Sequence, residues 1–78
     1  MKNQDISQFT AKLAETIHAE RKQRGLSHER LAEKAGLTRQ AVSHLEGPDS
    51  NPTVTSLLKL ADALEMDLSD LIKRVEAK

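Results

Sequence analysis

The segment GLTRQAVSHLEG, residues 36–47, places polar side chains at the spacing of one helix face. On a helix that starts at Thr38, the first turn and the outward side carry Thr38, Arg39, Gln40, Ser43 and His44, whereas Val42 and Leu45 fall on the opposite, apolar side. A guanidinium can donate two hydrogen bonds to guanine O6 and N7, and a carboxamide can pair with adenine N6 and N7. These side chains are typical of a helix that reads DNA bases, although an ordinary solvated helix face carries the same residue types.

The charge of the chain is balanced, which is unusual for a protein that binds a polyanion. The chain has twelve Lys and Arg residues and twelve Asp and Glu residues, so its formal net charge is zero. Residues 1–46 hold eight basic and six acidic side chains, a difference of +2, and residues 47–78 hold four and six, a difference of −2. The sign favours the first half as the surface that meets phosphate. Helix N-termini, with free N–H groups and a partial positive charge, would then supply much of the phosphate binding.

Local signals predict the first three of five helices. One helix runs from about Asp5 to Gly25, with apolar residues at spacings of three and four on one face: Ile6, Phe9, Leu13 and Ile17. A glycine just past the last turn can take the left-handed conformation that ends a helix. Ser27 offers an N-cap for a second helix over 28–35, which Gly36 ends, and Thr38 offers one for a third helix over 39–46.

The second half of the chain predicts two more helices after a loop. The turn-forming stretch GPDSNP separates the third helix from a fourth, which begins after Pro52-Thr53 and has on its inner face Val54, Leu57, Leu58, Ala61 and Leu64. Asp67 begins a fifth helix that contains Leu68, Leu71, Ile72 and Val75. Leucine and alanine supply most of the core, and Phe9 is the one aromatic residue. The expected fold is an all-α, compact five-helix bundle forming a single domain over residues 1–78.

Residues 28–46 match the helix-turn-helix pattern. Ala32 stands where two short helices approach most closely, and Gly36 tolerates the positive φ that the turn requires. The apolar residues that point into a shared core are Leu31, Leu37, Val42 and Leu45. In this motif the second helix lies in the major groove of DNA. A compact helical hairpin without function also favours alanine and glycine at a close crossing, so the segment alone leaves that alternative open.

The flanking sequence closely resembles the XRE family, the repressor–Cro type of helix-turn-helix domain. The resemblance covers residues 13–73 and rests on GLS at 25–27, LAEKAGL at 31–37, LLKLADAL at 57–64, and the frame of Glu46 with Asn51-Pro52-Thr53. It implies a lambda-repressor-like fold of five helices. It also implies a homodimer that binds double-stranded DNA at an inverted-repeat operator, as a sequence-specific transcriptional regulator and small repressor.

The resemblance assigns roles to individual residues. The positions that match Arg39, Gln40 and His44 reach base edges in the family, and Ser43 shares their outward face. The position of His28 is commonly a glutamine that bonds a phosphate, and a histidine can do the same, although His28 and His18 also fit ordinary surface histidines. The other expected phosphate contacts are Ser27, Thr38, Ser50 and Asn51. In the family, the residues at the positions of Arg21 and Glu46 form a buried ion pair. The resemblance therefore assigns a structural role to Arg21 and Glu46.

Three positions depart from the family pattern. The loop after the third helix has Asp49 and no Lys or Arg, which leaves Ser50, Asn51 and main-chain N–H groups as donors. Glu65 stands in place of a typical glycine, which costs about 1 kcal/mol if the site is left-handed. Arg30 replaces the glutamate that would complete a capping box with Ser27.

A dimer would have to form through the helices themselves, because no ligand-sensing or dimerisation domain is expected in these 78 residues. The fifth helix and its neighbours are the candidate interface, with Leu68, Leu71, Ile72 and Val75. The alternative is that these four residues close the core of the monomer.

Composition argues against several other classes. The chain has no cysteine, no glycine-rich phosphate loop and no H-E-x-x-H motif, and its histidines, on three predicted helices, lack metal-like spacing: His18, His28 and His44. We therefore expect no enzyme, no metal and no cofactor. Apolar runs of at most two residues and an N-terminus unlike a signal peptide predict no membrane association and a cytoplasmic location. The remaining alternative is an antitoxin-type or anti-repressor protein whose main partner is a toxin or another protein.

Overall fold

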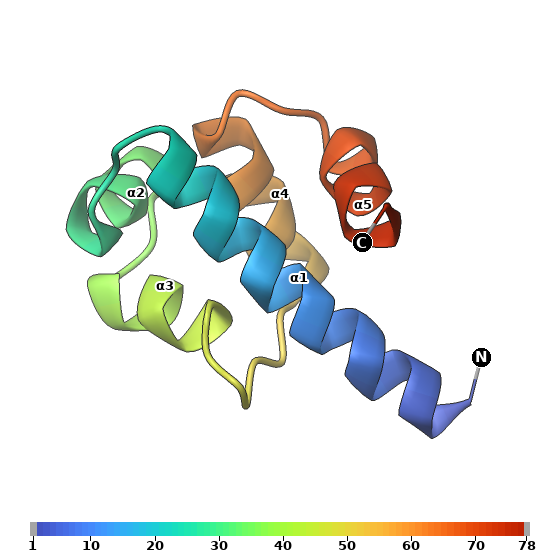
Figure 1. Ribbon diagram of the computed structural model, residues 1–78. Coiled ribbons are helices and arrows are strands. Elements are labelled where there is room, and N and C mark those ends of the chain that lie inside the picture. The colour runs from blue at the N-terminus through green and yellow to red at the C-terminus, as the bar shows by residue number, and fades with distance from the viewer. Residues whose placement is uncertain (1, 78) are drawn as a thin grey trace.

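The computed structural model describes residues 2–77, and this part of the chain folds into five α-helices without strands (Figure 1). The helices are α1 (Asn3–Gln23), α2 (His28–Ala35), α3 (Arg39–Leu45), α4 (Val54–Ala63) and α5 (Leu68–Glu76). The predicted all-α, five-helix fold is confirmed. None of the described helices has the length and apolar character needed to cross a lipid bilayer.

The helix ends follow the capping residues named from the sequence. The Ser27 hydroxyl accepts a hydrogen bond from the Arg30 backbone N–H, and the Thr38 hydroxyl accepts one from the Ala41 N–H, both at 3.0 Å. Gly36 has a left-handed backbone with φ of +69°, which ends α2 and turns the chain into α3. Because caps act over three or four residues, α2 begins and ends as predicted, and α3 ends one residue earlier than predicted, with Glu46 as its C-cap.

Glu65 occupies a left-handed backbone conformation, as the glycine that is typical at this position of the family indicated. Its φ is +59°, and no other non-glycine residue in the described chain has a positive φ. The side chain of an L-residue is crowded against the backbone in this region, at a cost of about 1 kcal/mol relative to glycine. The turn between α4 and α5 therefore carries local backbone strain.

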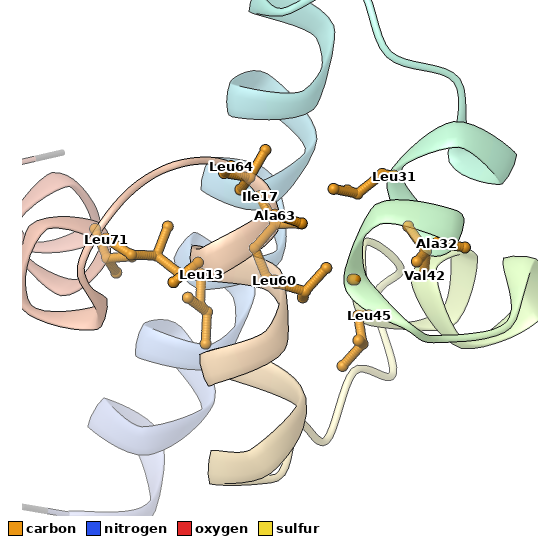
Figure 2. Close-up of a cluster of buried hydrophobic side chains, with 13 residues drawn as sticks. Leu13, Ile17, Leu31, Ala32, Val42, Leu45, Leu60, Ala63, Leu64 and Leu71 are labelled. Atoms are coloured by element: carbon orange, nitrogen blue, oxygen red, sulfur yellow. The ribbon is translucent and has the colours of Figure 1, made fainter.

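All five helices contribute to one hydrophobic core (Figure 2). Each helix contributes at least one fully buried large residue, in chain order Ile17, Leu31, Val42, Leu60 and Leu71. The predicted core residues of the helix-turn-helix lie here, with Leu31, Val42 and Leu45 buried and Leu37 packed against the cluster. The core therefore holds the α2–α3 pair against α1 and α4.

Two residues that the sequence placed on the inner face of α4 are exposed instead. Val54 and Leu58 keep 67% and 51% of their surface accessible. Leu58 lies about 100° around the helix from Leu57, which packs against the core, and Val54 lies in the first turn of α4. Ile6 is also exposed, and it lies in the first turns of α1, which extend past the other helices (Figure 1).

The apolar residues of α5 divide into two groups. Leu71 and Val75 are fully buried in the core, and Leu68 and Ile72 are half-buried. Leu71 and Val75 therefore close the core of the monomer and have no surface to offer a second subunit. A dimer role at α5 stays a prediction for Leu68 and Ile72.

Candidate nucleic-acid interface

Helix α3 exposes the polar side chains that the sequence identified. Arg39, Gln40, Ser43 and His44 are all exposed, and they lie within an arc of about 140° at 100° per residue. The opposite side of the same helix is anchored by Val42 and Leu45, which are buried in the core. The helix thus presents four hydrogen-bonding side chains on a surface that its apolar side holds in place.

The turn between α2 and α3 fixes the position of α3. The backbone N–H of Leu37 bonds the carbonyl oxygen of Ala32 at 2.9 Å, and Gly36 supplies the left-handed residue between the helices. Ala32 itself is buried, which allows the two short helices to pack closely. These contacts hold the two helices of residues 28–46 in a fixed relative position.

Possible phosphate donors lie at the starts of α2 and α3 and in the loop that follows α3. Ser27 and Thr38 are exposed, and each hydroxyl already accepts a backbone hydrogen bond, which leaves its O–H proton to donate. In the loop, Asn51 is exposed and Ser50 is half-buried, and the carboxylate of Asp49 is exposed beside them. Three segments therefore offer neutral hydrogen-bond donors, and the loop has no Lys or Arg.

A buried ion pair lies behind α3. Arg21 Nε donates to Glu46 Oε2 at 2.8 Å and Arg21 Nη2 donates to Glu46 Oε1 at 3.1 Å, and Arg21 Nη1 donates to the Leu26 carbonyl at 2.6 Å. The two side chains keep only 7% and 3% of their surface accessible. This is the ion pair that the resemblance implies, and it joins α1 to the C-terminal end of α3.

Two histidines, His18 and His28, contact the same carboxylate. His18 Nδ1 lies 2.7 Å and His28 Nε2 lies 3.1 Å from Glu46 Oε1. Burial by itself would raise the pKa of the Glu46 carboxyl, but hydrogen bonds from Arg21, His18 and His28 outweigh it and hold that pKa below its ordinary value. Glu46 is therefore ionised at neutral pH, and each histidine nitrogen that faces it must carry a proton.

The sequence did not reveal this convergence. His18 and His28 stand 28 and 18 residues from Glu46, so no local motif marks them, whereas His44 lies on the exposed side of α3. One signal was present: His18 precedes Arg21 by three residues on α1, which places both on one helix face. The contact also bears on the phosphate role predicted for His28, because Nε2 is engaged and only Nδ1 is left for DNA unless the ring turns outward.

A second charged cluster, also missed from the sequence, joins α1 to α5. The buried Glu20 carboxylate receives hydrogen bonds from Arg24 at 2.7 Å and from Arg74 at 2.6 Å. Burial would raise the pKa of Glu20, and the hydrogen bonds from Arg24 and Arg74 reverse that effect and lower it. Arg24 Nε also donates to the Leu64 carbonyl at the end of α4. This cluster supports the fold and lies apart from α3.

Comparisons with known proteins agree with this geometry. The chain is 38% identical over 60 residues to the HTH-type transcriptional regulator SutR of Escherichia coli strain K12, which covers 77% of this chain and 34% of SutR. It is 37% identical over 62 residues to the control protein C.SmaI of Serratia marcescens, covering 80% of this chain and 74% of C.SmaI. The chain thus spans about a third of the length of SutR and most of C.SmaI.

Solved structures share the fold as well. The restriction-modification controller protein C.AhdI from Aeromonas hydrophila superposes with a TM-score of 0.75 at 34% identity, over 80% of this chain and 94% of that protein. These relatives are a transcriptional regulator and two control proteins, in agreement with the regulator class that the sequence predicted. The helix-turn-helix family profile matches residues 17–71, which include the Arg21–Glu46 pair and the whole α2–α3 motif, and the chain therefore belongs to the HTH_3 helix-turn-helix family.

Proposed function

We propose that this protein is a sequence-specific, double-stranded DNA-binding transcriptional regulator that inserts α3 into the major groove. The observation that carries the proposal is the two-sided construction of α3. Arg39, Gln40, Ser43 and His44 are exposed together, while Val42 and Leu45 anchor the helix in the core. Membership of the helix-turn-helix family supports it, since this motif reads DNA with its second helix.

The candidate contact residues divide into base-reading and phosphate-binding groups. Arg39 suits guanine and Gln40 suits adenine, each pair discriminating by about 1–3 kcal/mol against a wrong base. The phosphate donors are Ser27, His28, Thr38, Ser50 and Asn51. Most of these donors are neutral and the chain has no net charge, so few counterions are released on binding and the affinity falls only modestly with salt.

We further propose that the regulator acts as a dimeric repressor on an inverted-repeat operator. Two control proteins, C.SmaI and C.AhdI, match this chain over most of their own length, which supports a regulatory role of the same kind. Exposed apolar surface is available for a second subunit: Val54 and Leu58 lie one turn apart on α4, and Leu68 and Ile72 of α5 are half-buried. A two-fold dimer would place two copies of α3 in successive major grooves.

Fluorescence anisotropy with the DNA upstream of the protein's own gene tests the DNA-binding proposal. Titrations across a salt series should show tighter binding to this DNA than to a scrambled duplex of equal composition, with a shallow salt dependence. Equal affinity for the two duplexes at every salt concentration would refute sequence-specific regulation.

Sedimentation equilibrium tests the dimer separately. Leu58→Asp should shift the free protein towards the monomer, because a carboxylate cannot be buried unpaired in an apolar interface. Lys59→Ala, which is exposed and lies about 100° around α4 from Leu58, is the control and should leave the association unchanged. A wild-type protein that stays monomeric on operator DNA would contradict the dimer proposal.

A further inference from the structure

The cluster around Glu46 brings together three atoms that can bind a metal ion. His18 Nδ1, His28 Nε2 and a Glu46 carboxylate oxygen all lie within 4.8 Å of one another. They belong to three parts of the fold: the second half of α1, the first residue of α2 and the C-cap of α3. An ion held here would therefore cross-link the helix-turn-helix to α1.

The donor set matches one metal in particular. Two imidazole nitrogens and one carboxylate oxygen form a three-ligand set that holds Zn²⁺ in proteins and leaves a fourth position open. Metal–ligand bonds of about 2.0–2.2 Å in tetrahedral geometry place neighbouring ligand atoms about 3.3–3.5 Å apart. The two N···O separations here are 2.7 and 3.1 Å, so the first must widen by about 0.6–0.8 Å and the second by about 0.2–0.4 Å, while the two ring nitrogens already lie within 4.8 Å of each other. The side chains of His18 and His28 are 52% and 31% exposed, so both rings have room to turn.

We propose that His18, His28 and Glu46 form a Zn²⁺ site whose fourth position faces solvent. In the metal-free protein the two facing ring nitrogens donate their protons to Glu46 Oε1. On binding, these nitrogens offer their lone pairs to the ion, and the ring protons sit on His18 Nε2 and His28 Nδ1 instead. Neutral imidazoles need only this change of tautomer. The site does not depend on DNA binding and is testable on the free protein.

Arg21 limits how tightly the ion binds. Its Nε stays on Glu46 Oε2 and its Nη1 stays on the Leu26 carbonyl, so Oε1 is the oxygen that the ion takes. Its Nη2, however, lies 3.1 Å from Oε1 and 3.3 Å from His18 Nδ1, where its positive charge repels a cation. Three ligands beside a guanidinium should therefore bind the ion more weakly than a closed structural zinc site does. Mg²⁺ should not bind, because it prefers oxygen ligands.

Isothermal titration of ZnCl₂ into the untagged, chelator-stripped protein at pH 7.5 tests the site. We expect one ion per chain, a loss of affinity of about tenfold or more in His18→Gln and in His28→Gln, and no response to MgCl₂. His44→Gln is the matched control for zinc binding, because His44 lies outside the cluster on the exposed side of α3. Absence of saturable zinc binding, or a loss in His44→Gln equal to that in the other two variants, would overturn the proposal.

Nitrogen-15 NMR of the wild-type imidazoles gives a second result that does not depend on the folding of any variant. Zinc should move the His18 Nδ1 and His28 Nε2 resonances to metal-bound positions and leave both His44 nitrogens unchanged. Resonances of all three rings that shift together in fast exchange would show only weak surface binding and would reject the site.

Discussion

The buried pair of Arg21 and Glu46 provides the sharpest test of what holds α3 in place. Arg21→Ala removes three hydrogen bonds, two to Glu46 and one to the Leu26 carbonyl. It leaves a carboxylate that is 3% exposed with only two histidine partners. Stranding one member of a buried ion pair costs roughly 3–5 kcal/mol. A domain of 78 residues has about 4–12 kcal/mol of stability in total, so we expect a large part of it to be lost.

Urea unfolding followed by far-UV circular dichroism measures this change. Arg30→Ala is the matched control, because the Arg30–Glu33 pair has a similar short separation of 2.7 Å but its side chains are 59% and 67% exposed. Water screens such a pair, and its loss should cost no more than about 1 kcal/mol. Burial, not the presence of an ion pair, is then what distinguishes the two arginines.

The double substitution Arg21→Met with Glu46→Leu separates the worth of the pair from the cost of stranding a charge. With both charges replaced by apolar groups, no carboxylate or guanidinium is left unpaired, so the double variant should be more stable than Arg21→Ala. The reasoning fails if Arg21→Ala costs no more than Arg30→Ala. It also fails if the double variant loses as much unfolding free energy as the single variants Arg21→Met and Glu46→Leu lose when their losses are added together.

Three further predictions rest on other features of the structure. Arg39→Ala should relax base preference at one operator position, whereas His28→Ala should weaken binding to all sequences about equally, and anisotropy with single-base operator variants distinguishes the two outcomes. Glu65→Gly should raise the unfolding free energy by about 1 kcal/mol in urea titrations, because glycine adopts a φ of +59° without strain; an unchanged midpoint would contradict this. The pKa values of Glu20 and Glu46 are lowered by folding, so their contribution to stability is present above the ordinary value of 4.5 and is lost as the pH falls below it. The melting temperature should drop over that range, and less steeply in Glu20→Gln.

The sequence by itself determined the helices and the face of α3 that meets solvent. Ser27, Thr38 and Gly36 act on backbone groups within a few residues, so the limits of α2 and the start of α3 could be read directly. Periodicity then placed Val42 inside and Arg39 outside, because the side chains of a helix keep fixed angular positions.

Only the tertiary structure decided where those helices meet. Helical spacing shows which residues share a helix face, but it does not show how much of that face a neighbouring helix covers. Val54 was for this reason wrongly assigned to the core. The convergence of His18 and His28 on Glu46 depends on the crossing of α1 with the α2–α3 pair. Side chains so far apart along the chain come within 4.8 Å only when the core fixes the positions of their helices, and no local pattern contains that information.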